Sequence, residues 1–368
     1  MFRILALAFL LSLTLAAQSP HWTRQYFYDD NEDDLTINDL QFSSAQRGIA
    51  IGFLSSRDNS GKPKPVALTT SDGGAHWSML RTKESGLSLF LLDDSVGWMV
   101  TENAIWQTVE AGRSWTRLSK LKDVNRVYFL DRNRGFAVCD KKSVYETKDG
   151  GKNWSEVEAA KKPEANPDYT SYDAIDFADA KNGIIAGGSS PPRHDAPLPE
   201  WLDPARAERR REWPTLSIVL ETRDAGRTWA ANTAPLLGRC VRVRLAPDGW
   251  GLSLFEFENA FQWPSAVYAI NLRTGKSVES FHAKNRVVTD VALFNGQQAF
   301  LAAIEPPGKA PNLPIPGKVK ILRTNDLKNW QNMDVDYRAV ATRVILAAVD
   351  PKHVWAATDT GMILKLTD

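Results

Sequence analysis

The sequence predicts an all-β protein: a seven-bladed β-propeller whose blades are four-stranded antiparallel sheets. Two repeated patterns support this fold. A short turn motif recurs along the chain, and seven segments begin with the same succession of apolar strands. In addition, the N-terminal segment resembles the strand that the last repeat lacks, so it can close the ring.

The recurring turn has the pattern Thr, any residue, Asp or Glu, any residue, Gly, two residues and Trp. Four copies are nearly intact and a fifth has lost the Gly and one residue: 70–77, 108–115, 147–154, 222–229 and 324–330. Their acidic residues are Asp72, Glu110, Asp149, Asp224 and Asp326. A carboxylate in a turn accepts bonds from nearby backbone N–H groups and Gly adopts positive φ, so we expect these acidic residues to be structural. The pattern resembles the Asp box of the BNR-repeat families, which implies a propeller fold.

A second pattern lies upstream of the turns. An apolar strand residue is followed six positions later by Gly in five pairs: Phe42/Gly48, Leu91/Gly97, Phe129/Gly135, Phe177/Gly183 and Leu245/Gly251. Two further segments, 291–304 and 344–358, keep the strands without the Gly. The blades are therefore expected to start near residues 38, 88, 126, 173, 241, 289 and 343, and each runs through strands A, B, C and D.

The two ends of the chain complete the prediction. The last repeat stops after its third strand, and HWTRQYFY near the N-terminus resembles the fourth strands of other repeats. We expect this N-terminal strand to complete the last blade, because an open blade exposes an unpaired edge. Residues 1–17 resemble a signal peptide, with Arg3 before an apolar run and small residues at its end. We therefore expect an exported protein, periplasmic, lumenal or secreted, with a single propeller domain over 18–368.

Composition narrows the function. The chain has 45 Lys and Arg against 44 Asp and Glu, so it lacks the net charge that attracts nucleic acid. Its two cysteines, Cys139 and Cys240, fall in different repeats, and the sequence leaves open whether they pair. The five His are isolated, and no phosphate-binding Gly loop is present. We expect a monomer without a metal or cofactor.

The signal peptide, the Asp boxes and strands of the form I-x-F…G-x-A-x-G together resemble the photosystem II stability and assembly factor family. The resemblance spans about residues 21 to 368. It implies a seven-bladed lumenal propeller that assists the assembly of a membrane protein without catalysis. Two features depart from the family pattern: blade five has no Asp box, and blade four carries a long insertion.

The long connections are expected on one face of the propeller. Four of them join strands B and C, and a fifth joins D to A: 55–65, 189–215, 255–265, 305–318 and 158–173. Long loops on one face of a rigid ring predict a binding surface. Its candidate residues are Trp201, Arg209, Arg210, Trp213, Phe257, Phe261 and Trp263. Aromatic and Arg side chains anchor protein interfaces and stack on sugars. The alternative is that the aromatic residues form a lid over the channel and the arginines a solvated face.

The first strand of each blade supplies a second candidate site. Arg126, Arg242 and Arg343 stand just before the first apolar position of their strands, as Asp39 and Asp290 do in two other blades. Such a ring of charges around the channel can hold a carboxylate or a peptide terminus. Alternatively, the charges pair with one another and with water.

These features predict a non-catalytic propeller that binds a protein partner, such as a membrane or envelope protein, through its long-loop face. The alternative is a sialidase-like or other glycoside hydrolase, or a glycan-binding propeller, in which the three arginines grip a substrate carboxylate and Tyr128 lies near them in sequence. Phe2-Arg3-Ile4 resembles a sialidase motif but lies within the signal peptide. A permanent structural module of a larger envelope assembly is a third reading.

Overall fold

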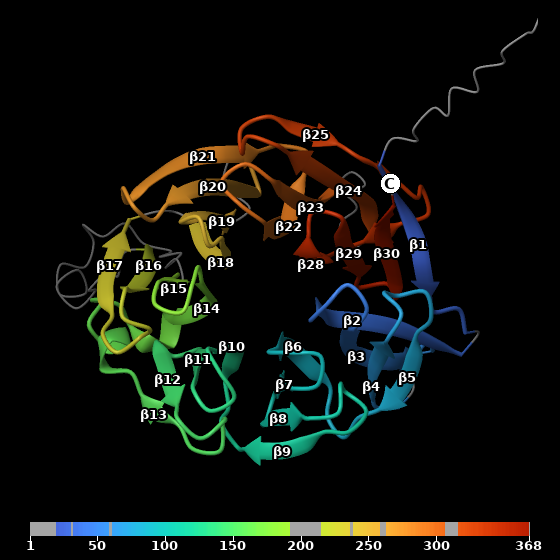
Figure 1. The fold of residues 1–368 in the computed structure, drawn as a ribbon, viewed down its shortest axis with the longest axis horizontal. Helices are drawn as coiled ribbons and strands as arrows, with labels where there is room; N and C mark the ends of the chain where they lie inside the picture. Colours follow the sequence, from blue (N-terminus) through green and yellow to red (C-terminus); the bar gives the residue numbers. More distant parts are fainter. Residues whose placement is uncertain are drawn as a thin grey trace, which may run out of the picture.

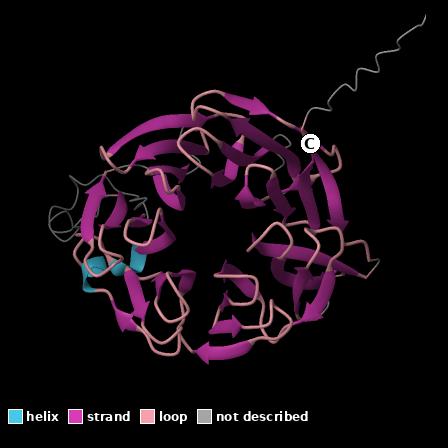
Figure 2. Ribbon diagram, viewed as in Figure 1, coloured by secondary structure: helices cyan, strands magenta, loops and turns pink. Residues whose placement is uncertain are grey.

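Seven sheets surround a central channel, which confirms the predicted seven-bladed propeller (Figure 1). The computed structural model describes residues 20–30, 32–58, 61–191, 215–235, 238–257, 263–305 and 316–367. Strands dominate these residues, and the two short helical turns lie beside blade 4 (Figure 2). None of the described residues belongs to a helix long and apolar enough to cross a membrane.

Blades 1 to 4 follow one another along the chain. Blade 1 contains β2 (Asp33–Phe42), β3 (Gly48–Ser56), β4 (Lys64–Thr70) and β5 (Ser78–Arg81). Blade 2 contains β6 (Gly86–Leu91), β7 (Gly97–Thr101), β8 (Ile105–Thr108) and β9 (Thr116–Ser119). Blade 3 contains β10 (Val124–Phe129), β11 (Gly135–Cys139), β12 (Ser143–Thr147) and β13 (Ser155–Glu156). The helical turns η1 (Glu158–Lys161) and η2 (Pro167–Tyr169) lead to blade 4, with β14 (Thr170–Phe177), β15 (Gly183–Ser189), β16 (Leu216–Thr222) and β17 (Ala230–Ala234).

Blades 5 to 7 complete the circle. Blade 5 contains β18 (Gly238–Leu245), β19 (Trp250–Phe257), β20 (Ser265–Asn271) and β21 (Lys276–His282). Blade 6 contains β22 (Val287–Leu293), β23 (Ala299–Glu305), β24 (Gly317–Thr324) and β25 (Trp330–Asn332), and β27 (Val340–Ala341) also pairs with β24. Blade 7 contains β28 (Val344–Asp350), β29 (His353–Thr358), β30 (Met362–Thr367), β1 (His21–Phe27) and β26 (Asp334–Val335). Within each blade, successive main strands run antiparallel.

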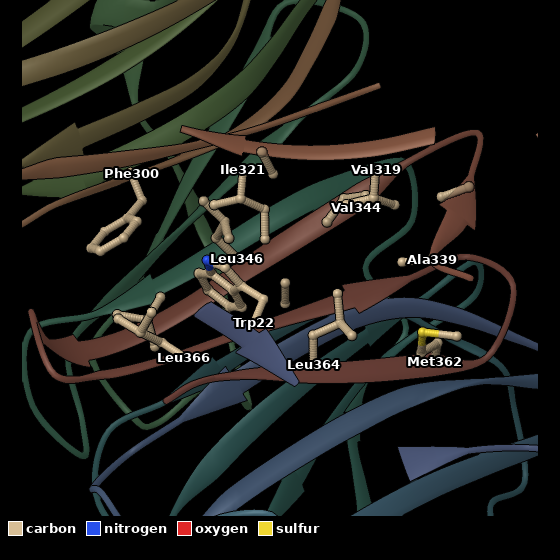
Figure 3. Packing of buried hydrophobic residues seen from close by; sticks show 14 of the residues in the cluster. Trp22, Phe300, Val319, Ile321, Ala339, Val344, Leu346, Met362, Leu364 and Leu366 are labelled. Atoms are coloured by element: carbon tan, nitrogen blue, oxygen red, sulfur yellow. The ribbon is translucent and has the colours of Figure 1, made fainter. Parts of the chain in front are cut away.

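The N-terminal strand closes the ring, as predicted. Strand β1 pairs antiparallel with β30 from His21 opposite Thr367 to Phe27 opposite Met362. Trp22 then projects into the core between blades 6 and 7, where it meets the edge of Phe300 (Figure 3). The short strand β26 adds parallel to the outer side of β1. The closing strand is therefore held by its hydrogen bonds, by a buried Trp and by a covered edge.

The Gly six residues after the apolar position has a packing role. A Cβ atom on Gly48, Gly135 or Gly183 would lie 2.6 Å from the ring of Phe42, Phe129 or Phe177, respectively. The same Gly in blades 2 and 5 faces Leu91 and Leu245. The last apolar side chain of the first strand therefore lies flat on the Gly that opens the second strand.

The rings that lie on these glycines also join neighbouring blades. Phe129 of blade 3 stacks on Trp98 of blade 2 with ring centroids 3.6 Å apart, and the Nε1 of Trp98 donates to the carbonyl oxygen of Gly150 (2.9 Å) in the turn of blade 3. Phe42 and Trp355 form the same stack between blades 1 and 7, with centroids 3.5 Å apart. The Trp of one blade thus packs against the first strand of the next blade, and in blade 2 it also binds the turn of that next blade.

The repeated turns are held by one hydrogen-bond pattern. In blade 3, Thr147 Oγ1 donates to Asp149 Oδ1 (2.9 Å), Gly151 N donates to Thr147 Oγ1 (2.9 Å), and Asn153 N donates to Asp149 Oδ1 (2.9 Å). In the four full-length turns both residues after the acidic residue adopt positive φ, with Ala111 and Ala225 at the first of these positions, and in the shortened turn Leu327 alone does so. The pattern recurs around Asp72 and Asp224, and in shortened form around Asp326. The turn around Glu110 keeps the Thr bond, and the Glu carboxylate accepts from Ser114 Oγ (2.7 Å). These carboxylates are committed to hydrogen bonds within their own turns.

Cys139 lies on β11 in blade 3 and Cys240 on β18 in blade 5. Both are buried free thiols. The structure therefore answers the question that the sequence left open: the two cysteines do not pair.

The ring-on-glycine contact gives a first prediction. Gly135→Ala should lower the free energy of unfolding by about 1–3 kcal/mol, because the added Cβ overpacks against Phe129. In a Phe129→Ala background the same substitution should cost far less, because the ring it meets is gone. Denaturant unfolding of the four proteins measures this coupling. Equal costs of Gly135→Ala in both backgrounds would contradict the contact.

The turn carboxylates give a second prediction. The pKa of Asp149 is lowered to about 2, chiefly by the backbone hydrogen bond from Asn153 and then by the side-chain bond from the same residue. Since a carboxyl group has an ordinary pKa near about 4, its stabilisation is complete above that pH and is lost as the pH falls toward about 2. Wild-type protein should therefore exceed Asp149→Asn in melting temperature at pH 5 and above, and this difference should shrink on acidification to pH 2. A difference that stays constant across this pH range would show that the charge of Asp149 does not stabilise the turn.

Candidate binding site at the long-loop mouth of the channel

The first strand of each blade lines the channel (Figure 1). These strands are β2, β6, β10, β14, β18, β22 and β28. Each begins after a connection from the preceding blade and ends at the short turn into its second strand. Because the connections between second and third strands lie on the same face as the strand starts, the start of each first strand faces the long-loop mouth.

Three Asp side chains bridge neighbouring first strands. Asp39 accepts from the backbone N–H of Leu40 (2.9 Å) and, across the blade boundary, of Leu89 (2.8 Å). Asp176 makes the equivalent bonds to Phe177 and Leu245, and Asp290 to Val291 and Leu346. Each carboxylate therefore satisfies backbone donors of two blades, which is a structural role.

Arg242 forms an ion pair with Asp290, one of these three bridging carboxylates. Its Nε donates to Asp290 Oδ1 (2.7 Å) and its Nη2 to Asp290 Oδ2 (3.2 Å), and both side chains are buried. Burial raises the pKa of Asp290, but Arg242 and then Arg244 lower it more, so its pKa falls below the ordinary value. Arg242 is thus a structural counter-ion, although its Nη1 is buried without a partner among the described residues.

The three predicted channel arginines meet at one hollow of about 370 Å³ at this mouth. Its lining residues are Leu87, Asn125, Arg126, Asp173, Val241, Arg242, Glu256, Thr289 and Arg343. They come from the starts of first strands and, for Glu256, from the end of β19, where a long loop begins. The structure therefore brings Arg126, Arg242 and Arg343 together, as the sequence predicted for a charged ring.

Arg126 and Arg343 are held more loosely than Arg242. The Nη1 of Arg126 lies 3.9 Å from Asp39 Oδ2 and 3.5 Å from Ser88 Oγ. Burial first, and then repulsion from Arg242, lower the pKa of Arg126 to about 9. Arg343 is exposed, and no ion pair within 4.0 Å joins it to another described residue. An anion entering the hollow would therefore meet two guanidinium groups with unused donors.

The hollow also contains two carboxylates that the sequence analysis did not single out. Asp173 accepts from two guanidinium nitrogens of Arg239, Nε and Nη2, with Nε 2.6 Å from Asp173 Oδ2. Glu256 faces the solvent of the hollow, yet partial desolvation raises its pKa above the ordinary value, while Arg343 and Arg239 act in the opposite direction. Asp173 stands at the start of its first strand like the predicted residues, so that position could have revealed it. Glu256 lies at the end of β19, in the segment 255–265 that the sequence analysis considered only for its aromatic residues.

A second hollow of about 280 Å³ lies toward the short-turn end of the channel. Arg126 lines both hollows, and Tyr128, Asp176 and Arg244 line this one. Tyr128 is therefore at a different hollow from Arg242 and Arg343. Its pKa is raised, chiefly by burial, which disfavours the phenolate that a nucleophilic Tyr requires.

The predicted aromatic surface is described only in part. Phe257 packs partly buried between blades 4 and 5, and Trp263 stacks on His282 with ring centroids 4.1 Å apart. Trp201, Arg209, Arg210, Trp213 and Phe261 lie outside the described residues. Among the residues that are described, no group of three or more His, Cys, Asp or Glu side chains is placed to hold a metal ion.

The fold and channel define a seven-bladed β-propeller with a charged hollow at its long-loop mouth. Solved structures include similar propellers. A YCF48 bound to D1 peptide is 15% identical over 96% of this chain and 97% of that chain, with a TM-score of 0.59. YCF48 from Cyanidioschyzon merolae is 14% identical over 94% and 98%, with a TM-score of 0.58. A GH74 xyloglucanase from Xanthomonas campestris is 14% identical over 94% of this chain and 53% of that chain, with a TM-score of 0.55. These likenesses show the fold. Neither protein-family models nor curated proteins give a match.

The channel arginines give a third prediction. Arg242→Met should lower the free energy of unfolding by about 3–5 kcal/mol, because it leaves Asp290 as a buried charge without its counter-ion. Arg343→Met should change it by no more than about 0.5 kcal/mol, because this side chain is exposed and makes no ion pair with a described residue. Denaturant unfolding at one pH compares the two. Equal losses would refute the distinction between a structural and an available arginine.

Proposed function

We propose that this protein is a non-catalytic, exported propeller that binds a polypeptide partner at its long-loop mouth and assists that partner's assembly or stability. The observation that carries the proposal is the meeting of Arg126 and Arg343, with unused donors, at one hollow of the channel. Carboxylates are the natural ligands of such donors. We infer that the mouth holds an acidic side chain or a C-terminal carboxylate of a membrane or envelope protein.

Two further considerations support this proposal. The turn carboxylates and the Asp bridges are used by the fold, whereas Arg126 and Arg343 at the mouth are held only loosely by the described residues. A propeller of similar fold, YCF48, has been solved bound to D1 peptide, which supports a polypeptide as the partner.

A glycosidase is the alternative that one observation favours. Glu256, whose pKa is raised, shares the hollow with Asp173, and a pair of carboxylates in which one is protonated is the machinery of glycoside hydrolysis. However, Asp173 is occupied by Arg239 and also accepts from Ser171 Oγ (3.1 Å). Hydrolysis of xyloglucan or aryl glycosides that is abolished by Glu256→Gln would establish the enzyme and refute the non-catalytic role.

Site-specific crosslinking tests the binding proposal. A photo-crosslinking amino acid is placed at Leu87, which lines the hollow and is 46% exposed, or at Val109, a 62% exposed residue of the turn between β8 and β9 on the opposite face. In native envelope extract, the Leu87 protein should capture one polypeptide. Adding Arg343→Glu should lower its yield at least about fivefold, since one reversed charge pair outweighs about 1 kcal/mol.

The Val109 protein is the matched control, because both positions are exposed apolar residues of blade 2. It should not capture the same polypeptide. Equal capture from both positions, or a Leu87 yield that Arg343→Glu leaves unchanged, would contradict binding at the long-loop mouth.

A further inference from the structure

One boundary between blades is built differently from the other six. In the described residues, each of the other boundaries contains at least one Trp in its core. In order around the ring, from the boundary between blades 1 and 2 to that between blades 7 and 1, these are Trp106 and Trp115; Trp98 and Trp154; Trp229; Trp250 and Trp330; Trp22; and Trp355 with Trp77. The core between blades 4 and 5 contains Ala186, Ile184 and Val243 beside Phe255, and no described Trp packs against it.

The sequence explains this difference. Ile184 follows the Gly that opens the second strand of blade 4, where blades 2 and 3 have Trp98 and Phe136. Blade 5 has no repeated turn, so it lacks the Trp that such a turn supplies to its own blade. Instead, a turn around Gly275 connects β20 and β21. Two positions that hold aromatic side chains between blades 2 and 3 and between blades 3 and 4 are therefore both without one between blades 4 and 5.

A hollow of about 480 Å³ occupies the space. Ile184, Val219, Val243, Phe255 and Ile270 supply its apolar walls. Exposed residues at its edge, from β17, from the turn between β20 and β21 and from the start of β21, show that it opens at the rim of the propeller: Asn232, Thr233, Gly275 and Ser277. This hollow is separate from the channel, because none of its lining residues lines either channel hollow.

We propose that the hollow between blades 4 and 5 is a binding site for a small, uncharged aromatic molecule of two or three fused rings. Its shape favours a flat ligand, since it lies between the faces of two sheets, which pack about 10 Å apart. Its volume is within the range of small-molecule sites, about 300–1,000 Å³, and exceeds the roughly 150 Å³ that holds one benzene.

The walls favour rings over aliphatic chains. Phe255 and Tyr268 line the hollow and meet edge to face at 5.5 Å, so they present ring surfaces to a third ring. The same fold packs planar rings at the equivalent place between other blades, as Trp98 does on Phe129. Polar groups at the opening, among them Glu221 and Asn232, can accept a hydrogen bond from a ring N–H or O–H group.

Binding of 2-naphthol at neutral pH, measured by isothermal titration calorimetry on the full chain, tests this site. Wild-type protein should bind one equivalent saturably. Ile184→Trp places a ring where blade 2 has Trp98, so it should fill the hollow and weaken binding at least tenfold. Val219→Trp is a second variant that should fill the hollow, because Val219 is a partly buried residue of its wall. If Ile184→Trp does not fold, 2-naphthol binding by Val219→Trp tests the proposal in its place.

Val278→Trp is the matched control, because Val278 is 61% exposed on the neighbouring β21 and does not line the hollow. It should bind 2-naphthol as the wild type does. Wild-type protein that fails to bind, or filling variants that bind normally, would overturn the proposal. Binding of 1-octanol as tight as that of 2-naphthol would overturn its preference for rings. Since the channel arginines take no part, these outcomes are independent of the proposed protein-binding function.

Discussion

The packing of an aromatic ring between two blades is the contact on which the rest of the molecule depends. Phe129 can lie flat over Gly135 because glycine has no Cβ, and its other face is then free to stack on Trp98 of the preceding blade. The indole nitrogen of that Trp in turn fixes the turn of the next blade. Hydrogen bonds also join neighbouring blades along the channel. Each of three carboxylates accepts from backbone N–H groups of two blades: Asp39, Asp176 and Asp290. Strand β1 closes the circle, so no blade keeps an unpartnered face.

The charged side chains of the propeller fall into two groups: those with structural partners and those free to bind a ligand. The turn carboxylates, the three Asp bridges and Arg242 all have partners that the fold requires. Arg126 and Arg343 have looser surroundings, and they lie at the end of the channel where the long loops begin. A rigid ring that carries two loosely held guanidinium groups at one mouth is suited to holding an anionic group of a partner, and this is why we place the proposed binding function there.

The sequence predicted the blade pattern because its signals are local. The Thr-to-Asp turn and the Phe-to-Gly spacing each lie within a few residues, and each reports a contact that forms within one blade. The closing strand could be predicted because the last repeat is visibly short of one strand. The pairing of β26 with β1 and of β27 with β24 could not, since these two-residue strands have no pattern of their own.

The site was predictable to a lesser degree. Strand position alone brought Arg126, Arg242 and Arg343 to one place, but it could not show that Asp290 neutralises Arg242 while Arg343 makes no such pair with a described residue. These differences depend on side chains from blades far apart in the sequence. The hollow between blades 4 and 5 is a similar case: the missing turn of blade 5 was visible, whereas the coincidence with a small Ile184 matters only once the two blades are adjacent.

If ring packing holds the blades together, the boundary without a described Trp should be the weakest. Native-state hydrogen exchange, followed by mass spectrometry at increasing denaturant, measures the opening free energy of each blade separately. The account predicts that β17 and β21, which flank the 480 Å³ hollow, open at lower denaturant than strands at the Trp-filled boundaries, such as β9 and β25, and before β1 detaches. Opening of all blades at one denaturant concentration, or earlier opening at β1, would contradict the claim that the interblade rings determine the stability of the propeller.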